Sequence, residues 1–231
     1  MNEEIAPGTE RADTAPAWTG ATTTATRLLL LRHGQSPMSV RREYSGSASD
    51  PALTEIGQQQ AQRAAAHLAR LQETGVWDIS AIIASPQLRT QQTAAAVAEA
   101  LGLRIDSDPR LRETDFGRWE GKTFSEAAAA DAQLHNQWLS DPSVAPPGGE
   151  SFHQVDERVA AARRSIEAQF AEQTVVVVSH VTPIKALLRQ ALAGNFELFT
   201  RLHLDLASLS VVEFYADGPT SVRLVNDTSY L

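Results

Sequence analysis

Three short apolar stretches of this sequence are each followed by residues that suit phosphate chemistry. These residues are Arg32, His33 and Gly34 after four leucines, Arg89 shortly after a second apolar stretch, and His180 after four valines. Arginine offers a planar fork of donors to phosphate oxygens, and a neutral imidazole is a nucleophile. Glycine permits close approach of the backbone. These residue types predict a phosphate site if the fold brings them to one place.

The apolar stretches predict the elements that position these residues. We expect strands at 27–31, 78–84 and 174–178, because short apolar runs bounded by polar residues are typical of strands buried on both faces. Ligands in open α/β sheets bind beyond the carboxyl ends of the strands. Arg32, His33, Arg89 and His180 all fall at such ends, so we expect them to converge.

Helices are expected between these strands. Ser85-Pro86 and Thr182-Pro183 predict capped helix starts with proline in the first turn, and Gly102 predicts the end of the first of these helices. Their N-terminal amide groups would point at the same phosphate. The alternation of strand and helix predicts a three-layer α/β/α sandwich with a mostly parallel central sheet.

Periodicity and turn signals assign the remaining segments. Thr54 predicts the cap of a helix to about Glu73, with a buried face of Leu53, Ile56, Ala61, Ala64, Leu68 and Leu71. We expect an irregular segment at 38–51, a third strand from Leu103, a long helix at 151–171 and hairpin strands at 206–215 and 221–225. A broken helix is expected at 122–141, anchored by Phe124, Leu134, Trp138 and Leu139.

Composition limits the classes of function. The 231 residues suit one large domain, and 20 basic against 28 acidic residues leave no basic footprint for nucleic acid. Without cysteine there is neither a disulfide nor a thiolate. No apolar run reaches membrane-spanning length, and the first residues lack a secretory signal. We expect a disordered leader at 1–26, a domain at 27–231 and a cytoplasmic protein; nothing in the sequence indicates an oligomeric state.

The other histidines do not predict a metal site. His67 and His203 are interpreted as structural, and His135 and His153 have no partner at metal-ligand spacing. The segment 117–123 nearly matches a nucleotide-binding P-loop. It has three residues rather than four between its glycines, and no apolar strand leads into it, so we interpret the match as coincidence.

Taken together, the motifs resemble those of a known family. In order, they are Arg32-His33-Gly34-Gln35-Ser36, Ser85-Pro86-Gln87-Leu88-Arg89-Thr90, the segment 111–121 with Glu113, Gly148-Gly149-Glu150-Ser151, and Ser179-His180. They resemble the histidine phosphatase (phosphoglycerate mutase-like) superfamily over about residues 27–230. The segments 146–152, 180–185 and 201–210 are most similar to the acid phosphatase domain found fused to ribonuclease H, which is related to α-ribazole phosphatases. No ribonuclease domain is expected within the leader.

The resemblance implies a role for each matching residue. His33 would be the nucleophile that forms a phosphohistidine, Arg32, Arg89 and His180 would hold the phosphoryl oxygens, and Glu113 would be the proton donor. Gly34, Ser39 and Val181 would add phosphate contacts, and neither a metal nor a cofactor is implied. The chemistry agrees: cationic neighbours should lower the pKa of His33, a charged His180 adds a donor, and a carboxyl beside a phosphate dianion is easily protonated.

Three positions depart from the family pattern. Ser39 stands where the family often has asparagine, and Glu43-Tyr44-Ser45-Gly46 replaces an Arg-x-Gln-Gly tract. Either Arg41 or Arg42 is a candidate for the missing outer contact. Val181-Thr182 follows His180 in place of two glycines, which restricts backbone approach to the phosphate.

The predicted activity is metal-independent hydrolysis of small phosphomonoesters, of the broad acid phosphatase or α-ribazole phosphate type. A mutase is disfavoured because residues 114–150 hold six acidic and two basic residues, the opposite of what a bisphosphate lid needs. A non-catalytic phosphate-binding module would need neither His33 nor Glu113. Trp119, Phe124, Trp138 and Phe152 either wall the entrance, which suits a ring-bearing alcohol, or belong to the core.

Overall fold

The computed structural model describes residues 19–231, so most of the expected leader at 1–26 lies outside the described residues. In its described part, Thr22 and Thr23 hydrogen-bond to the carboxylate of Asp217 at 2.6 to 2.9 Å. The first strand, β1 (Ala25–Arg32), follows. Within residues 19–231 no helix combines the length and the apolar character needed to cross a membrane.

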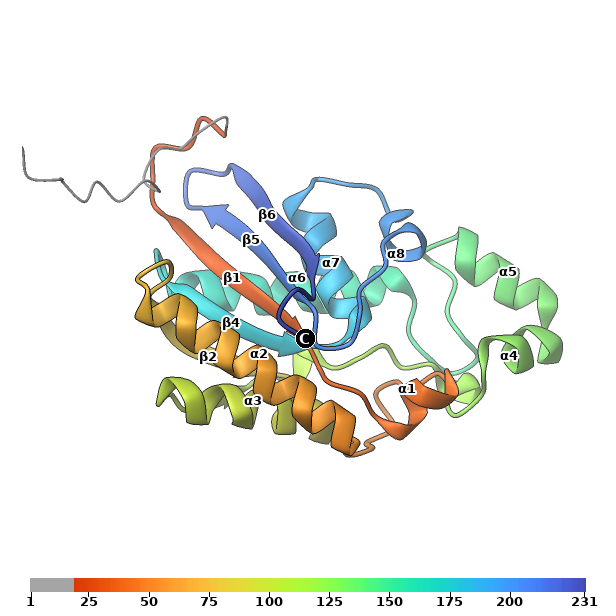
Figure 1. Cartoon of the computed structure of the whole chain (residues 1–231). Helices are drawn as coiled ribbons and strands as arrows, with labels where there is room; N and C mark the ends of the chain where they lie inside the picture. Colours follow the sequence, from red (N-terminus) through yellow and green to blue (C-terminus); the bar gives the residue numbers. More distant parts are fainter. Residues whose placement is uncertain (1–18) are drawn as a thin grey trace, which may run out of the picture.

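One six-stranded sheet lies in the middle of the fold, in the order β3-β2-β4-β1-β5-β6 (Figure 1). The other strands are β2 (Ile79–Ala84), β3 (Ile105–Ser107), β4 (Thr174–Ser179), β5 (Leu209–Tyr215) and β6 (Thr220–Asp227). Strands β1 to β4 are parallel, whereas β5 and β6 add antiparallel pairs at one edge. The predicted mostly parallel sheet is confirmed.

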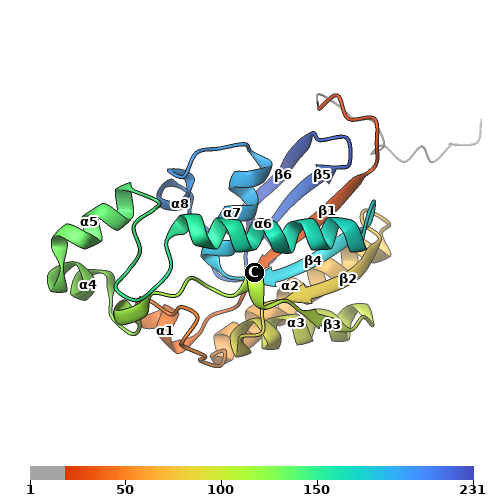
Figure 2. The same cartoon turned by 180° about the vertical axis from the view of Figure 1, so that it is seen from behind.

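Helices cover both faces of the sheet, which completes the three layers (Figures 1 and 2). One face carries α2 (Glu55–Glu73) and α3 (Leu88–Leu101), and the other carries α6 (Phe152–Gln169) and α7 (Val181–Ala191). The four buried leucines of β1 alternate between the two cores: Leu29 and Leu31 pack with α2 and α3, and Leu28 and Leu30 with α6 and α7. They fix the strand end that carries Arg32 and His33.

Short helices gather beyond the carboxyl ends of the parallel strands (Figures 1 and 2). They are α1 (Pro37–Arg41), α4 (Phe124–Ala130), α5 (Ala132–Ser140) and α8 (Leu198–Arg201), with 3₁₀ turns at Pro109–Leu111 and Gly117–Trp119. The break expected at 122–141 falls at Asp131, between α4 and α5. The segment at 38–51, expected to be irregular, begins in α1, which Ser36 caps.

Several local expectations are wrong. Helix α3 begins at Leu88, and its N-cap residue is Gln87 without a side-chain cap. Ser85 lies outside the helix, and its hydroxyl contacts His180. Helix α7 also lacks a side-chain cap. Ile56 and Phe124, expected to be buried, are 54% and 53% exposed, so periodicity alone misplaced them.

Candidate active site

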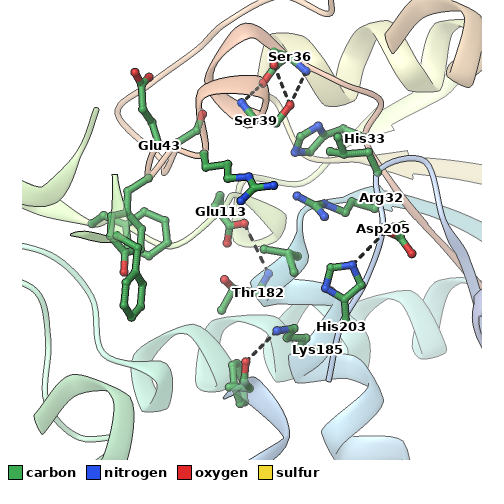
Figure 3. Close-up of a pocket in the computed structure, with 18 of the residues that line it drawn as sticks. Arg32, His33, Ser36, Ser39, Glu43, Glu113, Thr182, Lys185, His203 and Asp205 are labelled. Atoms are coloured by element: carbon green, nitrogen blue, oxygen red, sulfur yellow. Dashed lines mark hydrogen bonds and ion pairs between the residues drawn. The ribbon is translucent and has the colours of Figure 1, made fainter. Parts of the chain in front are cut away.

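A pocket of about 1030 Å³ opens where β1 and β4 end (Figure 3). Among the residues proposed from the sequence, those that line it are Arg32, His33, Ser39, Glu113 and Val181. Arg89 and His180 are fully buried close to it. The volume is at the upper end of the range for small-molecule sites, about 300–1,000 Å³.

The His33 imidazole is buried and neutral. Its Nδ1 lies 2.7 Å from the carbonyl oxygen of Gly34. A carbonyl only accepts, so Nδ1 carries the proton and Nε2 keeps the lone pair. Burial lowers the pKa of His33 well below its usual value, and Arg32 and Arg89 lower it further. The expected direction of this pKa shift is confirmed, with burial as its largest cause.

The second imidazole, that of His180, has the opposite arrangement. The ring centre lies 5.2 Å from that of His33, and Nε2 is 2.8 Å from the hydroxyl of Ser85. Nδ1 is buried and has no hydrogen-bond partner among residues 19–231. Burial, followed by Arg89 and other cations, lowers the pKa of His180 well below its usual value. Burial and the neighbouring cations thus oppose the positive charge expected on His180. A neutral ring that accepts from Ser85 at Nε2 presents Nδ1–H as a donor.

In both expected arginines Nε is buried and has no hydrogen-bond partner in the described part of the chain. In Arg32, Nη1 donates to the carbonyl oxygen of Leu204, and burial lowers the pKa to about 10. In Arg89, Nη1 donates to the carbonyl of Ser49 at 2.9 Å and Nη2 to that of Ser45 at 3.0 Å. Arg89 thus orders the segment at 45–49 as well as adding positive charge near His33.

The Glu113 carboxylate faces the pocket from the loop after the first 3₁₀ turn (Figure 3). It is 4% exposed and accepts from the backbone N–H of Thr114 at 2.8 Å and of Thr182 at 3.5 Å. The Thr182 amide in the first turn of α7 is therefore directed at this carboxylate. Arg158 donates to the carbonyl oxygen of Glu113 at 3.1 Å and forms an ion pair with Glu150. Glu150, which stands in one of the quoted motifs, thus helps to hold the backbone of Glu113 in place through Arg158.

Gly34 and Ser39 have contacts of their own. The N–H of Gly34 donates to the Thr93 hydroxyl at 3.2 Å, and its bare α-carbon packs against Gly57 of α2. Gly34 is thus not part of the pocket lining. The Ser39 hydroxyl lines the pocket but donates to the carbonyl of Ser36 at 2.7 Å and accepts from the Ser36 N–H at 2.9 Å.

The two neighbouring arginines differ in where they lie. Arg41 pairs with Glu43, with Nε and Oε1 2.6 Å apart, on the surface. Arg42 lines the pocket from a left-handed backbone conformation, φ 56°. Among residues 19–231, no hydrogen bond or ion pair involves its guanidinium. Of the two candidates for the missing outer contact, only Arg42 lines the pocket.

Sequence reasoning missed three residues of the site. Ser85 was taken for a helix cap but contacts His180. The buried amide of Gln87 accepts from the Glu113 N–H at 3.0 Å and donates to the carbonyls of Gly46 and Ser49. Lys185 lines the pocket one turn into α7. All three stand in segments quoted for the resemblance: Ser85 and Gln87 in the motif at 85–90, and Lys185 at the end of the segment 180–185.

The remaining histidines and aromatic residues can now be placed. His67 stacks on Tyr230, buried His135 contacts the Tyr44 hydroxyl at 3.0 Å, and His203, expected to be structural, lines the pocket beside Asp205. Phe124, Trp138 and Phe152 line the pocket as well, whereas Trp119 belongs to the core. Within residues 19–231 no group of three or more histidine or acidic side chains is arranged to hold a metal ion.

Comparison with known proteins now adds to this geometry. The sequence model of the histidine phosphatase superfamily (branch 1) matches residues 28–228. The chain belongs to this superfamily. As a histidine phosphatase it has the expected fold, and the phosphatases among its relatives confirm that this domain is a phosphatase.

Two relatives and one solved structure illustrate the likeness. A bifunctional protein of Mycobacterium tuberculosis is 54% identical over 218 residues, 94% of this chain and 58% of that protein. Phosphoserine phosphatase 1 of Hydrogenobacter thermophilus is 33% identical over 187 residues, 80% of this chain and 85% of that enzyme. A mycobacterial glucosyl-3-phosphoglycerate phosphatase with bound VO3 is 30% identical with a TM-score of 0.79, and the match covers 88% of this chain and 100% of that one. This histidine phosphatase chain thus spans little more than half the length of the bifunctional mycobacterial protein.

Proposed function

We propose that this domain hydrolyses phosphomonoesters without a metal ion, by transferring the phosphoryl group to Nε2 of His33. The observation that carries this proposal is the hydrogen bond from His33 Nδ1 to the carbonyl of Gly34. It leaves a buried, neutral nitrogen lone pair beside three polar nitrogens that lack partners: Nε of Arg32, Nε of Arg89 and Nδ1 of His180. A phosphate dianion would satisfy such donors.

In the first step, the lone pair of Nε2 attacks phosphorus and the bond from phosphorus to the ester oxygen breaks. Glu113, as a carboxylic acid, donates its proton to the departing oxygen, and the alcohol leaves. The Arg32 and Arg89 guanidinium groups neutralise the phosphoryl charge, a part that metal ions play at other phosphoryl-transfer sites, and Nδ1–H of His180 donates a hydrogen bond to a phosphoryl oxygen. Arg42 would replace the family's outer contact.

In the second step, water attacks the phosphohistidine. The Glu113 carboxylate accepts a proton from the water, the bond from phosphorus to Nε2 breaks, and the electron pair returns to the ring nitrogen. Phosphate leaves, and His33 and Glu113 recover their starting protonation. The same carboxyl group serves both steps, and the amides of Thr114 and Thr182 stabilise its carboxylate form, which the second step uses as a base.

The pocket supports a substrate with a sizeable alcohol. Its volume and the side chains of Phe124, Trp138 and Phe152 would suit an apolar or ring-bearing group. We propose a panel that includes p-nitrophenyl phosphate, α-ribazole phosphate, phosphoserine and sugar phosphates. The names of the relatives make the phosphorylated acids reasonable members of that panel.

Replacing the nucleophile tests the mechanism. In His33→Asn, hydrolysis of p-nitrophenyl phosphate should fall at least 10³-fold, because the difficult displacement loses its covalent intermediate. Rapid quench of the unaltered protein in base should trap an acid-labile phosphate on His33. Activity should persist in EDTA.

A matched control is His67→Asn, which removes a histidine that stacks on Tyr230 outside the pocket. It should keep full activity, and both variants should show the circular dichroism of the parent. Turnover of folded His33→Asn at the parental rate would overturn the mechanism, and loss of activity in EDTA would overturn its metal independence.

A further inference from the structure

Lys185 is a pocket residue that the proposed chemistry leaves unused. It follows Thr182 by one turn of α7 and points into the same cavity as Glu113 and Thr182 (Figure 3). Its Nζ donates to the carbonyl oxygen of Phe199 at 2.8 Å. An ammonium group has three N–H donors, and within residues 19–231 no other partner is recorded for this one.

The ammonium of Lys185 is half-buried, and no carboxylate of residues 19–231 is in contact with it. Glu113, the acidic group whose charge acts on it, is bonded to the amides of Thr114 and Thr182. The other pocket carboxylates are also engaged, Glu43 with Arg41 and Asp205 with Asn226. Burying a cation without a counter-ion costs free energy, and the result here is a pKa lowered to about 8 by that burial.

Lys185 lies on the side of the pocket where the alcohol part of the substrate would sit. The phosphoryl group belongs beside His33, and Glu113 must reach the ester oxygen between phosphorus and the alcohol. Lys185 lies one turn of α7 beyond Thr182, whose N–H contacts Glu113, and Figure 3 places it beyond Thr182 as seen from His33. It can therefore meet a group carried by the alcohol.

We propose that Lys185 is a specificity-determining residue that binds a carboxylate on the alcohol part of the substrate. One ammonium with one carbonyl contact carries a single positive charge, which a carboxylate matches. A second phosphoryl group would bring two negative charges, which one ammonium cannot balance. This inference rests on the proposed function, because it assumes that His33 receives the phosphoryl group.

The test compares two substrates that differ only at this group. 3-Phosphoglycerate carries a carboxylate where glycerol 3-phosphate carries a hydroxymethyl group. Lys185→Met should lower kcat/KM for 3-phosphoglycerate about 10- to 100-fold, mainly through KM, since hydrogen bonds to charged groups contribute about 1.5–3 kcal/mol. For glycerol 3-phosphate and p-nitrophenyl phosphate it should change kcat/KM less than about threefold. Lys185→Arg, which keeps the charge, should recover part of the loss.

Lys122→Met is the matched control, because it removes the other lysine of the chain, which does not line the pocket. It should leave both substrates unaffected. Equal losses on 3-phosphoglycerate and glycerol 3-phosphate in Lys185→Met would overturn the proposal and assign Lys185 to holding α8 through Phe199. A parent enzyme that hydrolyses p-nitrophenyl phosphate but shows no preference for the carboxylate would also overturn it, and would leave the proposed function standing.

Discussion

The two pocket histidines differ in the nitrogen that each leaves available. His33 commits Nδ1 to a carbonyl that can only accept, and His180 commits Nε2 to a hydroxyl that can donate. Two neutral rings 5.2 Å apart therefore present a lone pair and an N–H to the same space. Because burial holds both pKa values low, this division of roles needs no protonated imidazole.

At this scale, the proton donor is tested by leaving groups. Glu113→Gln should lower kcat/KM about 10²- to 10⁴-fold for alkyl phosphates such as glycerol 3-phosphate, because an alkoxide needs a proton to depart. For p-nitrophenyl phosphate the loss should stay below about tenfold. Since kcat/KM covers steps only through phosphoryl transfer to His33, later use of Glu113 as a base does not enter. Glu126→Gln, at an exposed cap of α4, is the control. Equal losses of kcat/KM on both esters in Glu113→Gln would assign the proton to another group.

The sequence predicted that Arg32, His33, Arg89 and His180 lie close together, because these residues follow predicted parallel strands whose carboxyl ends meet at one edge of the sheet. The partners of these residues were not predictable. Ser85 meets His180 from 95 positions away, and Gln87 meets the Glu113 N–H from 26 positions away. Such contacts depend on the three-dimensional packing, which no local pattern encodes.

At the scale of elements, the loop that carries His33 is held against α2 by two glycines. Gly34 and Gly57 lack side chains where their backbones meet, and a Cβ on Gly57 would overlap the carbonyl oxygen of Gln35. The long buried elements were predictable, since four leucines or four valines allow few alternatives. Helix α8 and the start of α3 were not predictable. A helix of a single turn depends on tertiary contacts, and so does the partner of the Ser85 hydroxyl.

Gly57→Ala tests this contact. Alanine inside a helix is normally favoured by about 1 kcal/mol, but the overlap with Gln35 should reverse the sign. We expect the free energy of unfolding to fall by roughly 1–3 kcal/mol in urea titrations and kcat to fall with it, as Gln35 is two residues from His33. Gln58→Ala, at an exposed position of the same helix, should be neutral or slightly stabilising. A stabilised Gly57→Ala would show that the loop moves freely.

At the scale of the whole molecule, the buried neutral histidines tie stability to pH. The pKa values of His33 and His180 are lower in the folded chain than the usual 6.5, so the unfolded chain binds more protons as the pH falls below 6.5. Stability must therefore decrease toward acid, by about 1.4 kcal/mol per pH unit for each imidazole while it stays neutral in the fold.

Urea unfolding at pH 7.5 and 5.5 measures this dependence. We expect a loss of roughly 2–3 kcal/mol in the parent and a clearly smaller loss in a His33→Gln, His180→Gln double variant. Stability that is constant or rises between these pH values would contradict neutral histidines in the folded state.

The order of strands in the sheet also bears on how the molecule folds. Strand β1 pairs with β4 and β5, whose residues lie about 150 and 185 positions further along the chain. Contacts between such distant segments form only after a large loss of chain entropy, which slows folding of nonlocal topologies. During synthesis β1 leaves the ribosome before β4 and β5 and must wait for both neighbours. The strand end that carries His33 is therefore among the last parts of the fold to be completed, and catalytic competence should appear together with the finished sheet.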